Sequence, residues 1–407
     1  MDNYQLTPSQ ESELLDRVAH RYKRTYEKYV ICCMERLVTE LLCNFPPRGY
    51  GEGTADIDLE AVYSAVSGYL KGVMHVEKFI SGAYYSDSVV VIVNDHIAVK
   101  IVRSDWEWLR ADVYDYHMRR NADYTPTPTA VVRVDRLEPF CDRLIYIRDN
   151  FSRWRAYFEK LHRPASRRLF ATCNDTIITS CIQGVMGQVY LDNRRSPKSA
   201  FAYAGCFGFL AGEPDESIFY HRPVFLIAVP LNEAWAEYIE KKCPKAKKIT
   251  RYAMKKDTCF DREKLKRYAS SLPEGYELKK IDIDLHDRCF EKEEFRDFVA
   301  VFEDCVRYMM LGRGVVVLKN GEIVAGASSY TRYVEGIEIE VDTLEEERRK
   351  GLATAACARL ILDCLDEGLY PSWDAANMTS VHLAEKLGYE FDHEYTAYEI
   401  DSMSRPE

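Results

Sequence analysis

The segment from Glu347 to Ala356, ERRKGLATAA, combines bases with small residues, the residue types of an anion-binding site. It follows an alternating apolar and acidic stretch, Ile337 to Asp342, and precedes helix formers with apolar positions at helical spacing. The pattern predicts a strand and then a helix that begins near Arg348, with Arg348, Arg349 and Lys350 in its first turn. Bases are disfavoured at this end of a helix because its macrodipole is positive there.

An anion bound at the helix N-terminus would make this basic turn favourable. Free backbone N–H groups bind the anion, and Lys and Arg add charge-assisted hydrogen bonds to phosphate oxygens. Gly351 and Ala353 have small side chains that let a large anion approach the backbone. The alternative is a surface helix whose bases pair with Glu345, Glu346 and Glu347 directly upstream. The order of strand and then helix favours the phosphate site.

The composition of the chain excludes several classes of protein. Its 407 residues are 47% hydrophobic and 29% charged, as expected for a globular protein of two or three domains. A formal net charge of −10 argues against sequence-independent binding of nucleic acid. Neither a targeting segment nor an apolar run of membrane-spanning length is found, so we expect a cytoplasmic protein without a membrane partner.

Cysteine and histidine spacing gives no sign of a metal site. The thirteen cysteines include no CxxC pair, and isolated histidines lack metal-ligand spacing. We therefore expect reduced thiols and no bound metal. The sequence leaves the oligomeric state open, with a homodimer as one option.

Three segments of the chain differ in pattern. Residues 1–165, of unknown role, combine amphipathic helices with a β-hairpin; residues 166–256 contain short strands separated by Gly and Pro. Residues 257–407 contain a hairpin that turns at Asn320-Gly321, followed by alternating strands and helices. The sequence predicts an α+β protein: a C-terminal mixed sheet with flanking helices, preceded by a smaller sheet domain and an N-terminal α+β region.

Four stretches have patterns that allow a specific local prediction. Apolar periodicity predicts one long helix from Pro8 to about Leu41, capped by Thr7, and a further helix from Trp106 to Tyr116. A strand is predicted from Arg143 to Arg148. The lysine-rich stretch from Lys242 to Lys256 is interpreted as a solvated face.

The last segment resembles the GNAT (GCN5-related) N-acetyltransferases. Their signature, Gln/Arg-x-x-Gly-x-Gly/Ala between the fourth strand and the third helix, binds the pyrophosphate of acetyl-CoA, and Arg348 to Ala353 fits it. Asn377 to Ser380 and Leu383 to Tyr389 are similar to the family's late helix with its Leu-Gly-aromatic end. A weaker resemblance from about residue 170, to a bacterial branch similar to an enzyme that acetylates the antibiotic zwittermicin A, makes residues 166–256 a degenerate GNAT-like half.

The resemblance implies acetyl-CoA as the acyl donor, attacked directly by an amine. It assigns the pantetheine and acetyl group to the backbone of Val341, Asp342 and Thr343. Two further sets are implied to bind the cofactor: the pyrophosphate loop with Arg348, Arg349, Lys350, Gly351, Leu352, Ala353 and Thr354, and the late helix with Asn377 and Ser380. Capping of the late helix is the alternative role of Asn377 and Ser380.

The resemblance also requires a general base, because an alkylamine is mostly protonated at neutral pH. The candidates are Glu338 and Glu340, which alternate onto one face of the predicted strand, with Asp342 as a third. Glu338 matches the position of the glutamate base in some family members. The alternative is that these acids face solvent on a half-exposed strand.

One position departs from the family pattern. Many members have a tyrosine general acid in the late helix, where this chain has Ala384. The remaining proton donors are Tyr389, Tyr395, Tyr398 or solvent.

The implied function is transfer of an acetyl group to a primary amine of a small molecule, such as an amine, an amino sugar or an antibiotic. Two alternatives stay open. A non-catalytic acyl-CoA sensor is favoured by Ala384, and a protein or peptide N-acetyltransferase is compatible with the surplus of acids.

Overall fold

The computed structural model of the chain describes residues 4–22, 29–43, 58–79, 88–94, 96–103, 109–115, 119–120, 126–128, 130–134, 136–161, 166–193, 196–302 and 304–401. The chain divides into two compact units, Met1–Pro164 and Ala165–Glu407. The division of the second unit into two domains at residue 256 stays a prediction. None of the helices in the described ranges combines the length and apolar character needed to cross a lipid bilayer.

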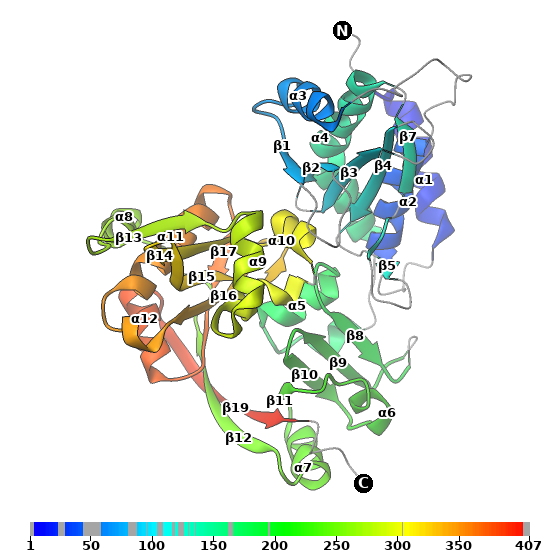
Figure 1. Cartoon of the computed structure of the whole chain (residues 1–407). Coiled ribbons are helices and arrows are strands. Elements are labelled where there is room, and N and C mark those ends of the chain that lie inside the picture. Colours follow the sequence, from blue (N-terminus) through cyan, green and yellow to red (C-terminus); the bar gives the residue numbers. More distant parts are fainter. Residues whose placement is uncertain are drawn as a thin grey trace. The chain divides into compact units, whose positions relative to one another are not determined.

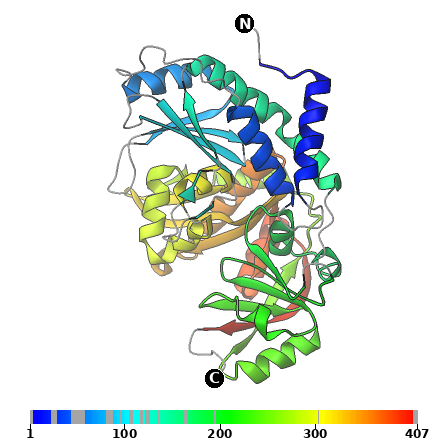
Figure 2. The same ribbon diagram turned by 90° about the vertical axis from the view of Figure 1, so that its right-hand side faces the viewer.

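The first unit is built on an antiparallel sheet in the order β1-β2-β3-β4-β7. Its strands are β1 (His75–Phe79), β2 (Ser88–Asn94), β3 (Ile97–Arg103), β4 (Leu109–Asp115) and β7 (Ala130–Val134), with β5 (Arg119–Arg120) and β6 (Pro126–Thr127) forming a separate pair. Its helices are α1 (Pro8–Arg21), α2 (Tyr29–Cys43), α3 (Leu59–Tyr69) and α4 (Leu137–Leu161). The helices gather on one face of the sheet, where alternate strand residues enter a shared apolar core (Figure 2).

Three local predictions for this unit are wrong. The predicted long helix is two helices, because Tyr22 is already extended at φ −117° and ψ 152°. The predicted helix from Trp106 to Tyr116 contains β4, which pairs with β3 and β7, so sheet pairing outweighs local helical periodicity. The predicted strand from Arg143 to Arg148 lies inside α4, whose apolar spacing is helical over 25 residues. The capping box at Thr7 is confirmed.

The second unit contains two sheets (Figure 1). One has five strands in the order β13-β14-β15-β16-β17: β13 (Tyr276–Lys280), β14 (Gly314–Lys319), β15 (Glu322–Tyr333), β16 (Gly336–Thr343) and β17 (Tyr370–Ser372). The other has seven strands in the order β18-β12-β19-β11-β10-β9-β8: β8 (Gln188–Leu191), β9 (Ser199–Ala204), β10 (Phe207–Gly212), β11 (Leu226–Pro230), β12 (Lys247–Met254), β18 (Asp374–Ala375) and β19 (Phe391–Ile400).

Helices cover both faces of the five-stranded sheet. On one face α11 (Leu352–Asp366) shares an apolar core with α8 (Arg262–Ala269), α12 (Met378–Leu387) and the β16 side chains Ile337 and Ile339. The opposite face of β16, which carries Glu338, meets α5 (Thr176–Gln183), as the hydrogen bond from Thr176 demonstrates. The remaining helices of the unit are α6 (Glu216–Phe219), α7 (Glu233–Lys242), α9 (Ile283–Glu291) and α10 (Cys305–Leu311), with short 3-10 turns at Ser166–Arg168, Glu293–Phe298, Ala300–Phe302 and Glu345–Glu347.

The seven-stranded sheet combines distant parts of the sequence. β19 lies between β11 and β12, and β18 pairs with the other edge of β12. The stretch from Lys242 to Lys256 therefore contains a strand, which the sequence reading missed. Lysines occupy the exposed positions at the start of β12, whereas Arg251 and Met254 are buried, so its apolar signal is weak.

Two turns next to the five-stranded sheet test predictions made from the sequence. Asn320 and Gly321 have positive φ values of 52° and 83°, which confirms the predicted hairpin turn. The helix predicted to begin near Arg348 begins at Leu352, with Gly351 as its N-cap. The three bases therefore lie in the loop before α11, and the expected conflict with the helix dipole does not arise in the first turn.

Candidate active site

The N-terminus of α11 has an open approach. Gly351 has φ 82°, and a Cβ atom placed on it would meet nothing within 4 Å. As N-cap, Gly351 provides no side-chain hydrogen bond to the first helical N–H groups. Leu352 is buried in the core, Ala353 is half-buried, and the Thr354 hydroxyl accepts a hydrogen bond from Lys386 Nζ at 3.3 Å. The first turn therefore offers free backbone donors to an anion.

The three bases before α11 have different partners. Arg348 Nε donates to the carbonyl oxygen of Thr343 at 3.1 Å, and Arg349 is exposed with a positive φ of 62°. Lys350 Nζ pairs with Glu347 at 2.8 Å, as the surface-helix interpretation expects for one of the bases. Among these described residues, neither Arg348 nor Arg349 forms an ion pair with Glu345, Glu346 or Glu347, whereas Lys350 does with Glu347.

Glu347 anchors this loop to the five-stranded sheet. Its carboxylate accepts hydrogen bonds from Lys319 Nζ at 2.7 Å, from Lys350 Nζ at 2.8 Å and from the Tyr276 hydroxyl at 2.5 Å. These donors lower the pKa of Glu347 to about 2. The carboxylate therefore stays ionised and holds Lys350 at the entrance to the helix.

The strand β16 has a free edge next to this loop. It pairs with β17 only from Gly336 to Glu338, whereas its pairing with β15 continues to Thr343. After Ser372 the chain leaves this sheet and joins β12 as β18. Val341 and Asp342 therefore have no strand beside them on this side among the described residues. The same edge carries Thr343, whose N–H donates to Asp342 Oδ1 at 2.6 Å.

Glu338 is a buried carboxyl group with an unused acceptor. Its side chain is 6% exposed; Oε2 accepts a hydrogen bond from the Thr176 hydroxyl, and Oε1 has no hydrogen-bond partner. Burial raises the pKa of Glu338 to about 7, Lys256 acts in the opposite direction, and Asp175 adds to the rise. A carboxyl with a pKa near neutral is suited to accept a proton at physiological pH.

Glu340 lies on the same face of β16, two residues further along. Burial raises the pKa of Glu340 to about 7, and the neighbouring carboxylates Asp297 and Asp342 add to this rise. Arg251 acts against it, more weakly. Glu338 is buried and Glu340 is half-buried, and both line the same recess, so the interpretation that they lie on a solvent-facing strand surface is wrong.

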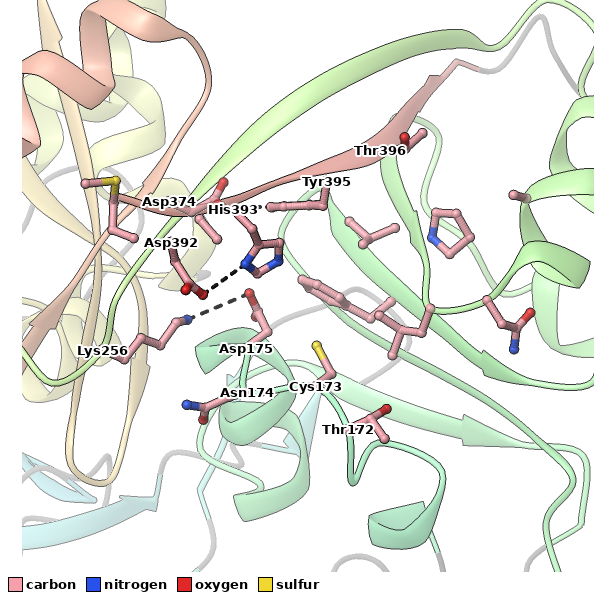
Figure 3. Close-up of a pocket in the computed structure, with 18 of the residues that line it drawn as sticks. Thr172, Cys173, Asn174, Asp175, Lys256, Asp374, Asp392, His393, Tyr395 and Thr396 are labelled. Carbon is pink, nitrogen blue, oxygen red and sulfur yellow. Dashed lines mark hydrogen bonds and ion pairs between the residues drawn. The ribbon is translucent and has the colours of Figure 1, made fainter. Parts of the chain in front are cut away.

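Two adjoining pockets give access to these acids. The outer pocket has a volume of about 540 Å³, and the inner pocket, of about 40 Å³, is lined by both Glu338 and Glu340. The residues that line both pockets are Asp175, Phe209, Asp374 and Tyr395. Figure 3 shows the outer pocket with polar groups from the N-terminus of α5, the end of β12 and β19 pointing into it.

Asp374 ties three strands together at the junction of the pockets. Its Oδ1 accepts from Arg251 Nε of β12 at 2.6 Å, and its Oδ2 accepts from the Tyr395 hydroxyl of β19 at 2.9 Å. Burial raises the pKa of Asp374, and the adjacent Arg251 opposes this rise. The Arg251 and Tyr395 side chains are thereby fixed beside the inner pocket.

The late helix residues have structural partners. Asn377 is the N-cap of α12 and its Oδ1 accepts from the Ser380 N–H at 3.0 Å. The Ser380 hydroxyl accepts from Trp373 Nε1 at 3.1 Å. Capping by Asn377 is therefore observed, whereas contact of either residue with a cofactor stays a prediction.

Of the three tyrosines considered as proton donors, Tyr395 alone lines the pockets. The Tyr389 hydroxyl donates to the carbonyl of Pro371 at 2.6 Å and is buried, and the Tyr398 hydroxyl donates to Glu240 at 2.6 Å. Ala384 is fully buried in the apolar core, so no proton donor stands at that position.

The charged pocket residues that the sequence did not indicate include Asp175, Arg251, Lys256 and Asp374. Arg251 lies inside β12 and Lys256 just beyond it, and the sequence did not predict this strand. Asp175 precedes the short helix α5, and Asp374 lies on the two-residue strand β18. Asp175 is the N-cap of α5, and its Oδ1 accepts a hydrogen bond from the Ile177 N–H at 2.7 Å. An Asp directly before a helical segment is the sequence signal that could have indicated this residue.

One group of potential metal ligands occurs elsewhere in the described residues. The ligand atoms of His286, Asp287 and Cys305 lie within 4.8 Å of one another. His286 Nδ1 is within 3.0 Å of Asp287 Oδ1, and Asp287 is exposed. The group does not line either of the two pockets that adjoin Glu338.

Comparisons with known proteins identify the family of the second unit. A model of the GNAT acetyltransferase family matches residues 167–398. The uncharacterized N-acetyltransferase YdfB of Bacillus subtilis (strain 168) is 28% identical over 251 residues, 56% of this chain and 90% of that protein. The crystal structure of a GCN5-related N-acetyltransferase-like protein from Streptococcus suis 89/1591 is 48% identical, with a TM-score of 0.55, and covers 57% of this chain and 96% of that one. The resemblance of the sequence to the GNAT N-acetyltransferases is confirmed.

Substitution of Glu340 by Gln is expected to stabilise the protein at pH 8. Between pH 4.5, the ordinary pKa of Glu, and about 7 the folded chain keeps a proton on Glu340 that the unfolded chain releases. Stability from this group is therefore present at low pH and lost as the pH rises through 7. At pH 8 the variant avoids burying a charge, so we expect a gain of about 1–2 kcal/mol, or roughly 2–8 °C in Tm.

Thermal unfolding of both proteins from pH 5 to pH 8 measures this effect. The difference in Tm should shrink toward pH 5, where Glu340 is neutral in the folded protein. Glu345→Gln, which alters an exposed acid, is the control and should leave Tm unchanged at either pH. A Glu340→Gln protein less stable than wild type at pH 8 would contradict the burial argument.

Proposed function

Because this chain belongs to the GNAT acetyltransferase family and is therefore an acyltransferase, we propose that it transfers the acetyl group of acetyl-CoA to a primary amine of a small molecule. The observation that carries the proposal is the Glu338 carboxyl group, buried with a free oxygen at the point where β16 and β17 part. A base at that point meets an amine that approaches a thioester lying along the free edge of β16.

The proposed cofactor site uses two features of the chain. The uncapped N-terminus of α11 and the exposed Arg348, Arg349 and Lys350 fit a pyrophosphate, since free N–H groups and cations converge there. The unpaired edge of β16 at Val341 to Thr343 fits pantetheine, whose amides require backbone partners. Both features lie on one continuous stretch of chain, which suits a long, phosphorylated donor.

The proposed reaction is a direct displacement. The amine loses a proton to Glu338, its nitrogen forms a bond with the thioester carbonyl carbon, and the carbon–sulfur bond then breaks. The departing thiolate takes up one proton, for which Tyr395 and solvent are the candidates. Glu340 is the second candidate for the base, because it lines the same inner pocket.

The outer pocket supports a small acceptor. Its volume of about 540 Å³ lies within the range of small-molecule sites, and its lining combines apolar residues with a few charged groups. A recess of this kind encloses a small amine better than a segment of a folded protein. An amino sugar or an antibiotic are acceptors of suitable size, and the zwittermicin resemblance remains a prediction.

Replacement of Glu338 by Gln is expected to lower kcat/KM by about 10²- to 10⁴-fold, as loss of a general base does. The measurement is release of free thiol from acetyl-CoA in the presence of a panel of amines, from pH 6 to pH 9. Glu340→Gln, on the same strand face, tests the second candidate: with Glu338 as the base, it should lose less than about tenfold. Full activity of Glu338→Gln across this range would remove Glu338 from the base role.

The same assay tests whether the chain is catalytic. A wild-type protein that binds acetyl-CoA by calorimetry, but releases no thiol with any amine in a broad panel, would favour the non-catalytic sensor.

Replacement of Gly351 by Asp is expected to weaken acetyl-CoA binding by at least about tenfold, because a carboxylate would repel the pyrophosphate at the helix N-terminus. Calorimetry measures the Kd. Gly368→Asp is the control: Gly368 follows the C-terminus of the same helix, has φ 74°, and a Cβ there also meets nothing within 4 Å. Equal affinity of Gly351→Asp and Gly368→Asp would contradict the proposed cofactor site.

A further inference from the structure

Lys256 is a cation inside the outer pocket that lacks a close partner. It lies two residues beyond β12, and its side chain is 21% exposed. The nearest ion pair is with Asp175 Oδ2, at 4.0 Å, and Lys256 makes no hydrogen bond to another described residue. Figure 3 shows Lys256 and Asp175 pointing toward each other across the pocket. A half-buried ammonium group with only this distant partner requires another reason for its position.

The carboxylates around Lys256 supply that reason. Burial acts to lower the pKa of Lys256, but Asp175, Glu338 and Asp374 outweigh it, so the pKa of Lys256 lies above its ordinary value. Lys256 therefore carries a full positive charge among three acids. An anionic part of a substrate would be repelled by these acids, so an anion-binding role for Lys256 is disfavoured.

The groups that face Glu338 come from several elements. Asp175 precedes α5 and Asp374 lies on β18; both are acids that disfavour the ionised form of Glu338. The Thr176 hydroxyl donates to Glu338, and Tyr333 of β15 and Tyr389 after α12 are neutral neighbours with raised pKa values. Arg251 is paired with Asp374. Asp175, whose Oδ2 lies 4.0 Å from Lys256 Nζ, lines both pockets and directly precedes Thr176, so Lys256 belongs to the cluster of charges around Glu338. In that cluster Lys256 is the cation that most favours the ionised form of Glu338.

We propose that Lys256 is a positioning residue for acetyl transfer: its charge favours the ionised form of Glu338, which is the form that can accept a proton from the acceptor ammonium. This inference rests on the proposed function, in which Glu338 is the base. Without Lys256, burial and two neighbouring carboxylates act together on Glu338, and its pKa rises above neutral. Glu338 would then hold a proton at pH 7 and be unable to accept one from the amine.

The test is the pH dependence of Lys256→Met, which keeps most of the length of the side chain and removes its charge. The ratio of variant to wild-type kcat/KM, measured with one amine from pH 6 to pH 9, cancels the titration of the acceptor. We expect the acidic limb to move up by about one pH unit or more, so that the ratio is about 0.1 near pH 6.5 and approaches 1 near pH 9. Lys256→Arg should restore the wild-type profile.

Lys255→Met is the matched control. Lys255 is the adjacent lysine, and it pairs with Glu390 at 2.6 Å on the exposed surface. Its substitution removes the same charge from the next position in the chain and should leave the profile unchanged. An equal ratio at every pH for Lys256→Met would assign Lys256 a merely structural role and overturn the proposal.

A measurement that does not require turnover separates this inference from the proposed function. Carbon-13 NMR of labelled glutamate, with the Glu338 signal assigned by its loss in Glu338→Gln, follows the ionisation of Glu338 directly. A midpoint higher in Lys256→Met than in wild type supports the inference, and an unchanged midpoint overturns it, whether or not an amine substrate is found. Lys256→Gln serves the same comparison if Lys256→Met does not fold.

Discussion

The parting of β16 from its neighbour is the constraint on which the rest of the second unit depends. The two strands β16 and β17 pair for three residues, and beyond Ser372 the chain crosses to the seven-stranded sheet. The gap leaves one edge of β16 without backbone partners and, at its base, leaves Glu338 in a recess rather than in a packed core. An unpaired backbone edge and a carboxyl group are both costly to bury without hydrogen-bond partners, and here they lie side by side. An acyl donor along the edge and an amine at the carboxyl group would provide those partners.

The seven-stranded sheet compensates the charge that this gap creates. Buried carboxylates are tolerated only beside cations or in the protonated form. The chain uses both solutions: Arg251 pairs with Asp374, and Lys256, five residues later, faces Glu338 and its neighbours. Both cations come from β12 or its end. The seven-stranded sheet thus contributes charged groups to the candidate site as well as a wall of the outer pocket.

Sequence patterns predict the local parts of this site and miss its long-range parts. The hairpin at Asn320-Gly321 could be predicted because a positive φ restricts the residue type at each position. Gly351 could be singled out because a small residue lets an anion approach the backbone, although the sequence placed it inside the helix and not at its N-cap. The place of Lys256 in the pocket could not be predicted, because it ends a run of lysines that is typical of a solvated surface. The pairing of β12 with β19 is what shows that this run enters a sheet. The predicted strand from Arg143 to Arg148 is wrong for a related reason, because a pattern of six residues cannot distinguish a strand from one part of a 25-residue helix.

The position of β19 has a consequence for biosynthesis. Both neighbours of β12, namely β18 and β19, follow it by more than a hundred residues; Met254 and Phe391 are 137 positions apart. At a translation rate of about 5–20 residues per second, synthesis of the residues between β12 and its partner β19 takes roughly 7–27 s. The N–H and C=O groups of β12 stay unpaired in that interval, which makes this strand a natural binding segment for chaperones and a point where a nascent chain can misassociate.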